Sequence, residues 1–365
     1  MPGHRLAKVV TSSIGALCLI EGYYGYEIAL LEVITSLKYR DYTHDKRPLK
    51  YQSCVDPRIK PSTEEEPLLK AIRFLDIYAV KGVMQYLLTI RNQTHYFGVK
   101  NLRTALDRPD GVGLLTVSNH VTTIDSASLP CPNIHFRDLL NPRNCGYWNL
   151  AREDQTFETA PKAMICSLAK LMPIHRGGGV YQIALDNFIQ RIKYGDWGHI
   201  FPEGRTYQEQ LKSCRDEQGR RIRASGRTAP PGRDLGPMKW GVGRVIYEAA
   251  KQQEESSFVN GVNNGKIMIL PFYHLNMEKV LPEDEDLKVI SFIPGKKNDI
   301  YCMFGKPIDV SDIMEDSKKK LASCKTEEEK EQMMFVIYKE LTDRVEMSLA
   351  SLEYKLKALR QMDQE

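Results

Sequence analysis

A histidine and an aspartate five residues apart are the side chains whose types and spacing best fit acid–base chemistry. His120 and Asp125 lie within residues 118–125, SNHVTTID, directly after the apolar run 113–117. An imidazole titrates near neutrality, and a carboxylate that binds one ring nitrogen leaves the other able to take a proton from a hydroxyl group. The pair would form the base half of a catalytic triad without its serine.

The elements around this pair decide whether the two side chains meet. The apolar run predicts a buried strand, and Thr122 with Asp125 three residues later is a capping-box pattern that predicts the first turn of a helix. A turn at Thr122 would bring Asp125 back to His120. The structural alternative is that Asp125 only caps the helix and His120 only fills the strand end.

A second predicted strand, 197–201, runs into a Pro-Glu-Gly-Arg turn. Arg205 could bind a phosphate through its planar guanidinium fork, and Gly204 would let a ligand approach the backbone closely. Glu203 could fix the arginine or accept a ligand hydroxyl. The same residues also form an ordinary turn in many proteins.

Two more predicted strands end in residues of interest. The strand 171–175 leads into Arg176 and three glycines ahead of a predicted helix, where an anion could bind, with a flexible turn as the alternative. The strand 266–273 contains Pro271, which predicts an edge strand or a bulge of the kind that often lines a site. His274, which follows, is best interpreted as a satisfied core histidine.

The central region as a whole alternates short apolar segments with helical patterns, which is typical of an α/β layer architecture. Two further short strands are expected at 290–294 and 301–304. Helices are expected at 161–170, 180–194 and 236–253.

Helical patterns also precede this region. The apolar segments 9–20 and 28–37 are too short to span a bilayer, which needs about 20 apolar residues. They predict amphipathic helices that either pack on the body or lie at a membrane surface, and they faintly resemble a transit peptide. Residues 40–66 contain three prolines and predict a linker or surface loop. A basic amphipathic helix is expected at 67–89, again with either role open.

The composition is that of a soluble globular protein, and a net charge of +4 over 365 residues is too small to indicate nucleic-acid binding. Eight cysteines are scattered without zinc-site spacing, so the sequence predicts neither a disulfide framework nor a metal site. Residues 212–233 carry seven basic and two acidic residues. This segment could dock on anionic headgroups or form a solvated loop, and the absence of aromatic residues among its arginines argues against RNA.

In their order along the chain, these segments resemble the glycerolipid acyltransferase superfamily, and within it the tafazzin family. The likeness covers roughly residues 100–310, and an ordered set of motifs is more specific than any one of them. It rests on Asn119-His120-x4-Asp125, the Arg176 turn, Phe201-Pro202-Glu203-Gly204-Arg205 and Ile269-Leu270-Pro271.

The resemblance implies an α/β fold, with a single acyltransferase domain whose mixed central sheet is flanked by helices. This domain would span 99–310, including the basic insertion 212–233. An N-terminal helical, membrane-associating region, 1–98, would precede it, and a helical tail, 311–365, would follow. In the tail, Thr326 with Glu329 predicts the cap of a long helix.

The resemblance also implies a CoA-independent phospholipid–lysophospholipid transacylase that remodels cardiolipin. It would be a peripheral protein of the outer or inner mitochondrial membrane, facing the intermembrane space. His120 and Asp125 would be catalytic. The substrate-binding residues would be Asn119, Arg176, Glu203, Gly204, Arg205 and Pro271.

The expected partners are phospholipid and lysophospholipid substrates and an anionic membrane surface, with no nucleic acid, no metal and no other cofactor. The oligomeric state is not predicted. Residues 133–158, where the resemblance would place an interfacial membrane anchor, are polar. An acyl-CoA-dependent lysophospholipid or glycerol-phosphate acyltransferase would use the same motifs. A catalytically silent membrane-binding protein would use the amphipathic helices and the basic insertion.

Overall fold

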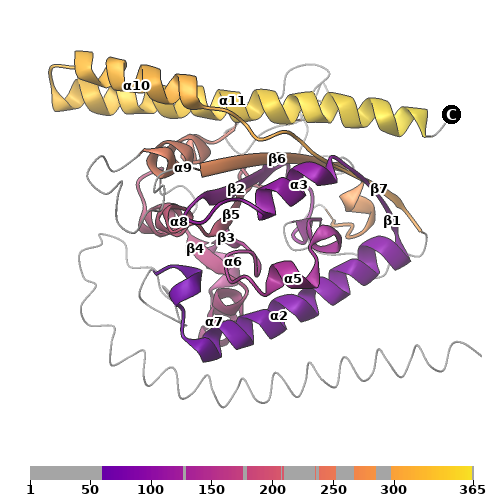
Figure 1. Cartoon of the computed structure of the whole chain (residues 1–365). Helices are drawn as coiled ribbons and strands as arrows, with labels where there is room; N and C mark the ends of the chain where they lie inside the picture. The colour runs from indigo at the N-terminus through magenta and orange to yellow at the C-terminus, as the bar shows by residue number, and fades with distance from the viewer. Residues whose placement is uncertain are drawn as a thin grey trace, which may run out of the picture.

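A seven-stranded sheet lies at the centre of the molecule, between two sets of helices (Figure 1). The computed structural model describes residues 60–125, 129–175, 179–206, 208, 235, 238–251, 267–284 and 297–363. The predicted segments 9–20, 28–37, 212–233 and 290–294, and residue Arg176, lie outside these residues. The strands are β1 Gln93–Phe97, β2 Gly113–Ser118, β3 Trp148–Arg152, β4 Leu171–Ile174, β5 Trp197–Ile200, β6 Ile267–Leu275 and β7 Asp299–Phe304.

The sheet is mixed, with strand order β1-β7-β6-β2-β5-β3-β4. The five strands from β6 to β4 are parallel to one another, β7 is antiparallel to β6, and β1 is parallel to β7. The carboxyl ends of the five parallel strands therefore meet at one edge, which is where ligands bind in open α/β sheets. The predicted α/β class with a mixed sheet flanked by helices is confirmed.

Five of the strands match predicted ones, and two were missed. β2, β4, β5, β6 and β7 correspond to the apolar segments of the sequence. β1 is QTHYF and β3 is WNLAR, which are partly exposed and carry polar residues. Neither is an apolar run, so only their pairing with β7 and β5 reveals them as strands.

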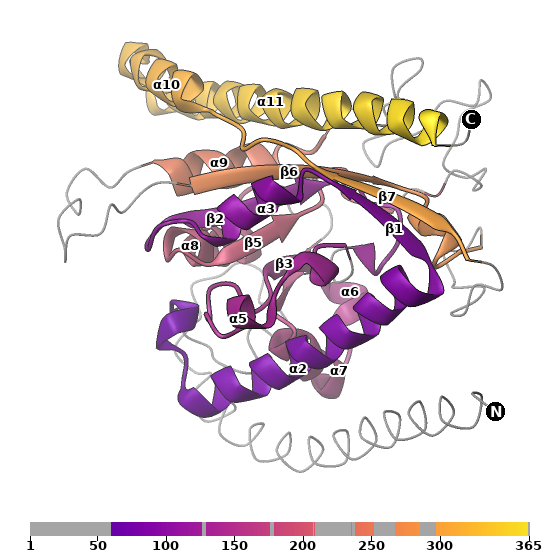
Figure 2. The ribbon, with the colours of Figure 1, turned by 45° about the vertical axis from the view of Figure 1, so that its right-hand side comes forward.

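Helices cover both faces of the sheet. α8 and α9 pack on one face, and the long helix α11 crosses over α9 and β6 with α10 beside it; α3 and α2 lie on the opposite side (Figure 2). Within the described residues, the helices of four or more residues are α2 Pro67–Gln85, α3 Val99–Leu106, α5 Phe136–Leu139, α6 Glu153–Thr156, α7 Ala160–Leu168, α8 Ile183–Lys193, α9 Gly241–Ala250, α10 Ser311–Ser323 and α11 Glu327–Met362, with η3 Tyr86–Arg91 continuing α2 as a π-helix. Single 3-10 turns occur at η2 Ser62–Glu64, η4 Cys131–Asn133 and η6 Met277–Lys279.

β2 shows how the strand pattern builds two cores. Alternate side chains point to opposite faces of a strand. Leu115 and Val117 join the core with α8, α9 and α11, and Leu114 joins the core on the other face. Thr116 and Ser118, which alternate with Leu115 and Val117, are fully buried although polar. This second face therefore carries hydrogen-bonding groups beneath the end of the strand.

The predicted cap of the C-terminal helix is confirmed. The Glu329 N–H donates to Thr326 Oγ1 at 3.1 Å, and the Thr326 N–H donates to Glu329 Oε2 at 3.2 Å. α11 approaches α9 so closely that a Cβ on Gly243 would lie 1.9 Å from the Tyr338 carbonyl oxygen. Only glycine permits this crossing.

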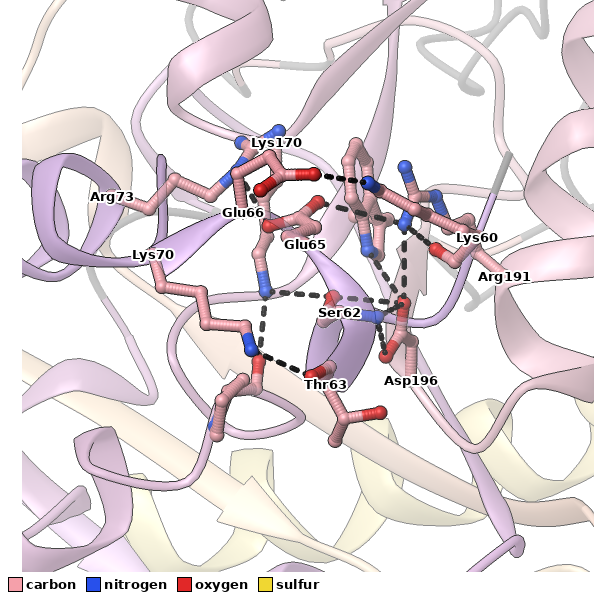
Figure 3. A network of polar contacts seen from close by, with 12 residues as sticks. Lys60, Ser62, Thr63, Glu65, Glu66, Lys70, Arg73, Lys170, Arg191 and Asp196 are labelled. Atoms are coloured by element: carbon pink, nitrogen blue, oxygen red, sulfur yellow. Dashed lines mark hydrogen bonds and ion pairs between the residues drawn. The ribbon is translucent and has the colours of Figure 1, made fainter. Parts of the chain in front are cut away.

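A buried polar network fixes the segment that precedes α2 (Figure 3). Ser62 donates to the Asp196 carboxylate through its N–H and its hydroxyl, the latter at 2.9 Å. Glu65 binds Arg73 at 3.0 Å, and Arg191 lies between Glu65 and Asp196 at 3.6 and 3.7 Å. Burial raises the pKa of Asp196, and nearby cations oppose that shift. Buried charges are tolerated only when paired in this way.

This network ties residues 60–66, the described part of the predicted linker or surface loop, to the domain, because Ser62 and Glu65 are buried. The boundary expected at residue 98 cuts off β1, which is an integral strand of the sheet.

Candidate active site

His120 lies just beyond β2 and is within hydrogen-bonding reach of Asp125. The His120 Nδ1 is 3.3 Å from Asp125 Oδ2, so a proton on Nδ1 points to the carboxylate and Nε2 keeps its lone pair. The imidazole side chain is 18% exposed, whereas that of Asp125 is fully buried. The geometry expected for the pair is therefore present.

The Asp125 carboxylate is also the anchor of the turn. Its Oδ2 accepts the N–H groups of Val121 and Thr122, and its Oδ1 accepts the Thr122 hydroxyl at 2.7 Å. The Thr122 hydroxyl donates to the Asp125 carboxylate instead of accepting the Asp125 N–H. Of the predicted capping box, only the bond from the Thr122 N–H to the Asp125 carboxylate forms. Burial alone would raise the pKa of Asp125, but His274, His120 and Thr122 together hold it below its usual value. The carboxylate is thus ionised and fixed beside the imidazole.

The turn after β5 supports His120 from the other side. Glu203 is 3% exposed, and its Oε1 accepts the backbone N–H of His120 at 2.9 Å. The His120 ring stacks on Phe201, with ring centroids 3.8 Å apart and planes 12° from parallel. Two neighbouring parallel strands thereby fix both the backbone and the ring of the histidine.

Gly204 and Arg205 line the space in front of this histidine. Gly204 has a φ of +75°, and a Cβ there would lie 2.5 Å from Lys239 Cε and 2.9 Å from Lys239 Nζ. Glycine is therefore required both by the backbone and by the lysine packed against it. Lys239 and Arg205 bring positive charge to this end of the site, where it suits a phosphate.

A chain of buried polar groups lies behind His120, on the face of the sheet that also carries Thr116. Trp197 donates from Nε1 to the Thr116 hydroxyl at 3.0 Å, and that hydroxyl is 2.9 Å from His199 Nδ1. The His199 Nε2 is 3.4 Å from Ser118 Oγ. Burial lowers the pKa of His199 to about 3, with His120 and His274 adding to the shift. His199 is therefore a neutral hydrogen-bonding link.

Asn119 and His274 join β2 to β6. The Asn119 amide donates to the His274 carbonyl and accepts its N–H, both at 3.0 Å, and His274 Nε2 is 3.0 Å from the Asn119 carbonyl. Asn119 is 2% exposed, so its side chain holds the strand end rather than facing a ligand, which corrects its assignment to the substrate. His274 is fully buried, as expected, and lies 3.6 Å from Asp125 Oδ2.

Pro271 is also placed differently from the expectation. β6 is an interior strand between β7 and β2, not an edge, and Pro271 pairs in register with Val117 without a bulge. Its carbonyl accepts the Gly305 N–H at 2.8 Å. Pro271 is buried in the sheet and does not line the site.

A cavity of about 980 Å³ opens in front of the His120 ring. Apolar side chains from α2, β4, α8 and α9 line one part of it, including Ile77, Val80, Ile174, Leu185 and Val242. The reactive end is lined by His120, Thr123, Phe201, Gly204, Arg205 and Glu283. A space of this size and polarity suits a lipid, whose chain needs apolar walls and whose headgroup needs a few polar contacts.

Sequence reasoning missed three residues of this site: His199, Lys239 and Glu283. His199 sits in the predicted strand 197–201, so its inward direction could have been found from the alternation of that strand. Lys239 and Glu283 lie 119 and 163 residues from His120, and only the fold brings them to the same cavity. Among the described residues, no three His, Cys, Asp or Glu side chains gather as a metal-ion site.

Parts of this chain are similar to known proteins. Residues 98–274 match the model of the Acyltransferase family. An N-acylphosphatidylethanolamine synthase of Arabidopsis thaliana is 27% identical over 63% of this chain and 69% of its own length. Tafazzin of Drosophila melanogaster is 27% identical over 58% of this chain and 45% of its own. The protein named taffazin of Dictyostelium discoideum is 27% identical over 56% and 61%.

These likenesses confirm the prediction of an acyltransferase that resembles tafazzin. The matched region contains β2, β5 and the turn residues that surround His120. The chain spans less than two thirds of the length of the two tafazzins.

Proposed function

Taking the chain as a tafazzin-like acyltransferase, we propose that it is a phospholipid–lysophospholipid transacylase that works without coenzyme A and remodels cardiolipin. The observation that carries the proposal is the His120 imidazole, held by Asp125 at Nδ1 and open to the cavity. The likeness to the two tafazzins supports the proposal.

In the proposed reaction, His120 Nε2 takes the proton of the acceptor lysolipid hydroxyl as the oxygen attacks an ester carbonyl of the donor phospholipid. A new ester C–O bond forms, and the donor ester C–O bond breaks. The departing oxygen takes the proton from the imidazolium and leaves as a lysophospholipid. Asp125 holds the ring in the required tautomer and stabilises its charged form. The reaction needs no serine and no activated acyl carrier.

We assign the positioning of the acceptor lysolipid to the two cations at the reactive end of the cavity. Arg205 and Lys239 would bind the phosphate, with Gly204 leaving room for it. Glu203 acts through His120 by fixing its backbone. Holding the hydroxyl against the imidazole removes much of the entropic barrier. Arg176, predicted to share this task, lies outside the described residues.

We assign membrane contact to the outer face of α2, η3 and α5, and place the protein at a mitochondrial membrane. The exposed apolar side chains there, each at least 49% exposed, are Leu68, Leu75, Tyr78, Val83, Ile90, Phe136 and Leu140, the last directly after α5. Phe74, Tyr78 and Phe136 form an aromatic cluster there. Ile77, Val80 and Lys81 of α2 also line the cavity, so a lipid could pass from this face to His120. Among the described helices, none is both long and apolar enough to span a bilayer.

The deciding experiment measures acyl transfer without coenzyme A. Purified protein is mixed with vesicles that contain an acyl-labelled phospholipid and an unlabelled lysophospholipid, and we expect label in the acceptor. His120→Ala should lower the rate about 10²- to 10⁴-fold. His95→Ala, on β1 outside the cavity lining, is the matched control and should keep the rate.

Each other outcome favours a rival. Transfer only from acyl-CoA would show an acyl-CoA-dependent acyltransferase, and no turnover with any donor would favour a silent membrane-binding protein. The products are also treated with mild alkali, which cleaves esters and spares amides, because the Arabidopsis relative is named for an N-acylated lipid. Unimpaired transfer by His120→Ala would reject the mechanism.

A further inference from the structure

Glu283 is a buried carboxylic acid that lines the reactive end of the cavity and takes no part in the mechanism above. It is 1% exposed. Neither of its carboxyl oxygens accepts a well-formed hydrogen bond from the described residues, although the Thr123 N–H lies close enough to the carboxylate to lower its pKa. A buried carboxyl group without well-formed hydrogen bonds is costly, so such a group in a cavity points to a ligand that supplies the missing donors.

Hydrogen bonds with the Gln208 side chain fix the backbone at Leu281 and at Glu283. The Gln208 side chain accepts the Glu283 N–H at 3.0 Å and donates to the Leu281 carbonyl at 3.0 Å. Gln208 is itself 1% exposed. The clamp holds the segment after η6 against the turn that follows β5.

The surroundings of Glu283 carry charges of both signs. It is the single carboxylate among the described residues that line the cavity, whereas Arg205 and Lys239 line the same cavity as cations. The cations suit a phosphate, and the carboxylate suits a hydrogen-bonding cation. A zwitterionic headgroup that joins a phosphate to a primary ammonium combines both.

We propose that Glu283 binds the ammonium group of the acceptor lipid, so that the site prefers acceptors with an ethanolamine-type headgroup. This inference rests on the proposed function for the acceptor's place in the reaction, in which cardiolipin would then serve as the acyl donor. A quaternary ammonium keeps the charge but has no N–H to donate, so a choline headgroup would satisfy Glu283 less well. A glycerol headgroup brings hydroxyl donors but no positive charge.

The protonation of Glu283 agrees with this role. Burial raises its pKa to about 6, with Asp125 and Asp284 adding to the rise and His120 and the Thr123 N–H opposing it. The carboxylate is therefore ionised near neutral pH and protonated near pH 5. The preference for an ammonium acceptor should fade across this interval. The ratio between acceptors reports this change, because any pH effect on the transfer step itself is common to all acceptors.

The activity test compares lysophosphatidylethanolamine, lysophosphatidylcholine and lysophosphatidylglycerol as acceptors. We expect kcat/KM for the ethanolamine acceptor to fall about 10- to 100-fold in Glu283→Gln, as for loss of a hydrogen bond to a charged group, with the glycerol acceptor unchanged. Asp284→Asn removes the neighbouring carboxylate, which does not line the cavity, and should retain the preference. Equal acceptor ratios in wild type and Glu283→Gln would overturn the proposal.

A binding test separates this proposal from the proposed reaction. The same three lysolipids are presented in diether phosphatidylcholine vesicles to the intact protein and to Glu283→Gln, and thermal unfolding reports binding. The proposal is supported if the ethanolamine lipid raises the unfolding temperature more than the other two lysolipids do, and if this difference is lost in Glu283→Gln. This result would support the proposal even if no acyl transfer occurs with any donor. A shift that is the same for all three lysolipids, or that survives in Glu283→Gln, rejects it even if transfer is fast.

Discussion

The Glu203 carboxylate accepts the backbone N–H of His120 at 2.9 Å, across 83 residues of sequence. The bond ties the turn after β5 to the end of β2. Because β2 and β5 are paired in parallel register, both strands deliver their following residues to the same edge of the sheet. The position of the histidine is thus set by a residue of the other motif.

Glu203→Ala should lower kcat about 10- to 100-fold while changing KM little. The His120 backbone N–H would lose its hydrogen bond, and the imidazole would no longer be held in position. Glu203→Gln should recover much of the loss, since its amide oxygen still accepts the N–H. Steady-state kinetics on the proposed transfer reaction check this. Equal impairment of both variants would mean that the charge of Glu203, rather than its hydrogen bond, matters.

Gly204→Ala should raise KM for the acceptor lipid about tenfold. The added Cβ would lie 2.5 Å from Lys239 Cε and force that cation to move. Gly179→Ala is a matched control, because Gly179 has almost the same φ, +74°, but no atom within 4 Å of the added Cβ. Both variants carry the same backbone strain, so the difference between their KM values isolates the lysine. A Gly179→Ala protein with the same KM defect would assign the effect to backbone strain.

Glu283→Gln should stabilise the protein at high pH. The folded-state pKa of Glu283, about 6, lies above its usual 4.5. The protonated form is therefore favoured by folding, and its stabilising contribution, complete below pH 4.5, is lost as the pH rises through 6. The cost of the ionised group is about 2 kcal/mol, at roughly 1.4 kcal/mol per pKa unit.

Urea unfolding at two pH values measures this difference. At pH 8 the variant should exceed wild type in unfolding free energy by about 2 kcal/mol, and at pH 4 the two should agree. A variant that is less stable than wild type at pH 8 would show that Glu283 has a stabilising partner.

Leu75→Glu with Tyr78→Glu should weaken binding to anionic vesicles about tenfold or more, since each buried apolar side chain contributes about 1.5–3 kcal/mol. Both residues are exposed on α2, at 63% and 49%. The control carries Met347→Glu and Tyr354→Glu on α11, where both side chains are also exposed. Vesicle co-sedimentation measures both proteins. If the α11 variant loses as much binding, net charge rather than the α2 face governs attachment.

The sequence alone determined the elements that depend on local patterns. Apolar runs gave β2, β4, β5, β6 and β7 because buried strands must be apolar on one or both faces. The cap of α11 followed from Thr326 and Glu329, whose side chains reach only their own turn. The proximity of His120 and Asp125 was predictable for the same reason, since five residues and one turn separate them.

The tertiary structure decided everything that depends on contacts between distant segments. β1 and β3 exist because neighbouring strands complete their hydrogen bonds, not because their residues are strongly apolar. Asn119 and Pro271 proved to be structural, since Asn119 is buried just beyond β2 and Pro271 lies within the interior strand β6. Glu203 was singled out by its turn, but only strand pairing showed that it holds His120. Glu283 became visible as a site residue only when folding buried its carboxyl group without a well-formed hydrogen bond.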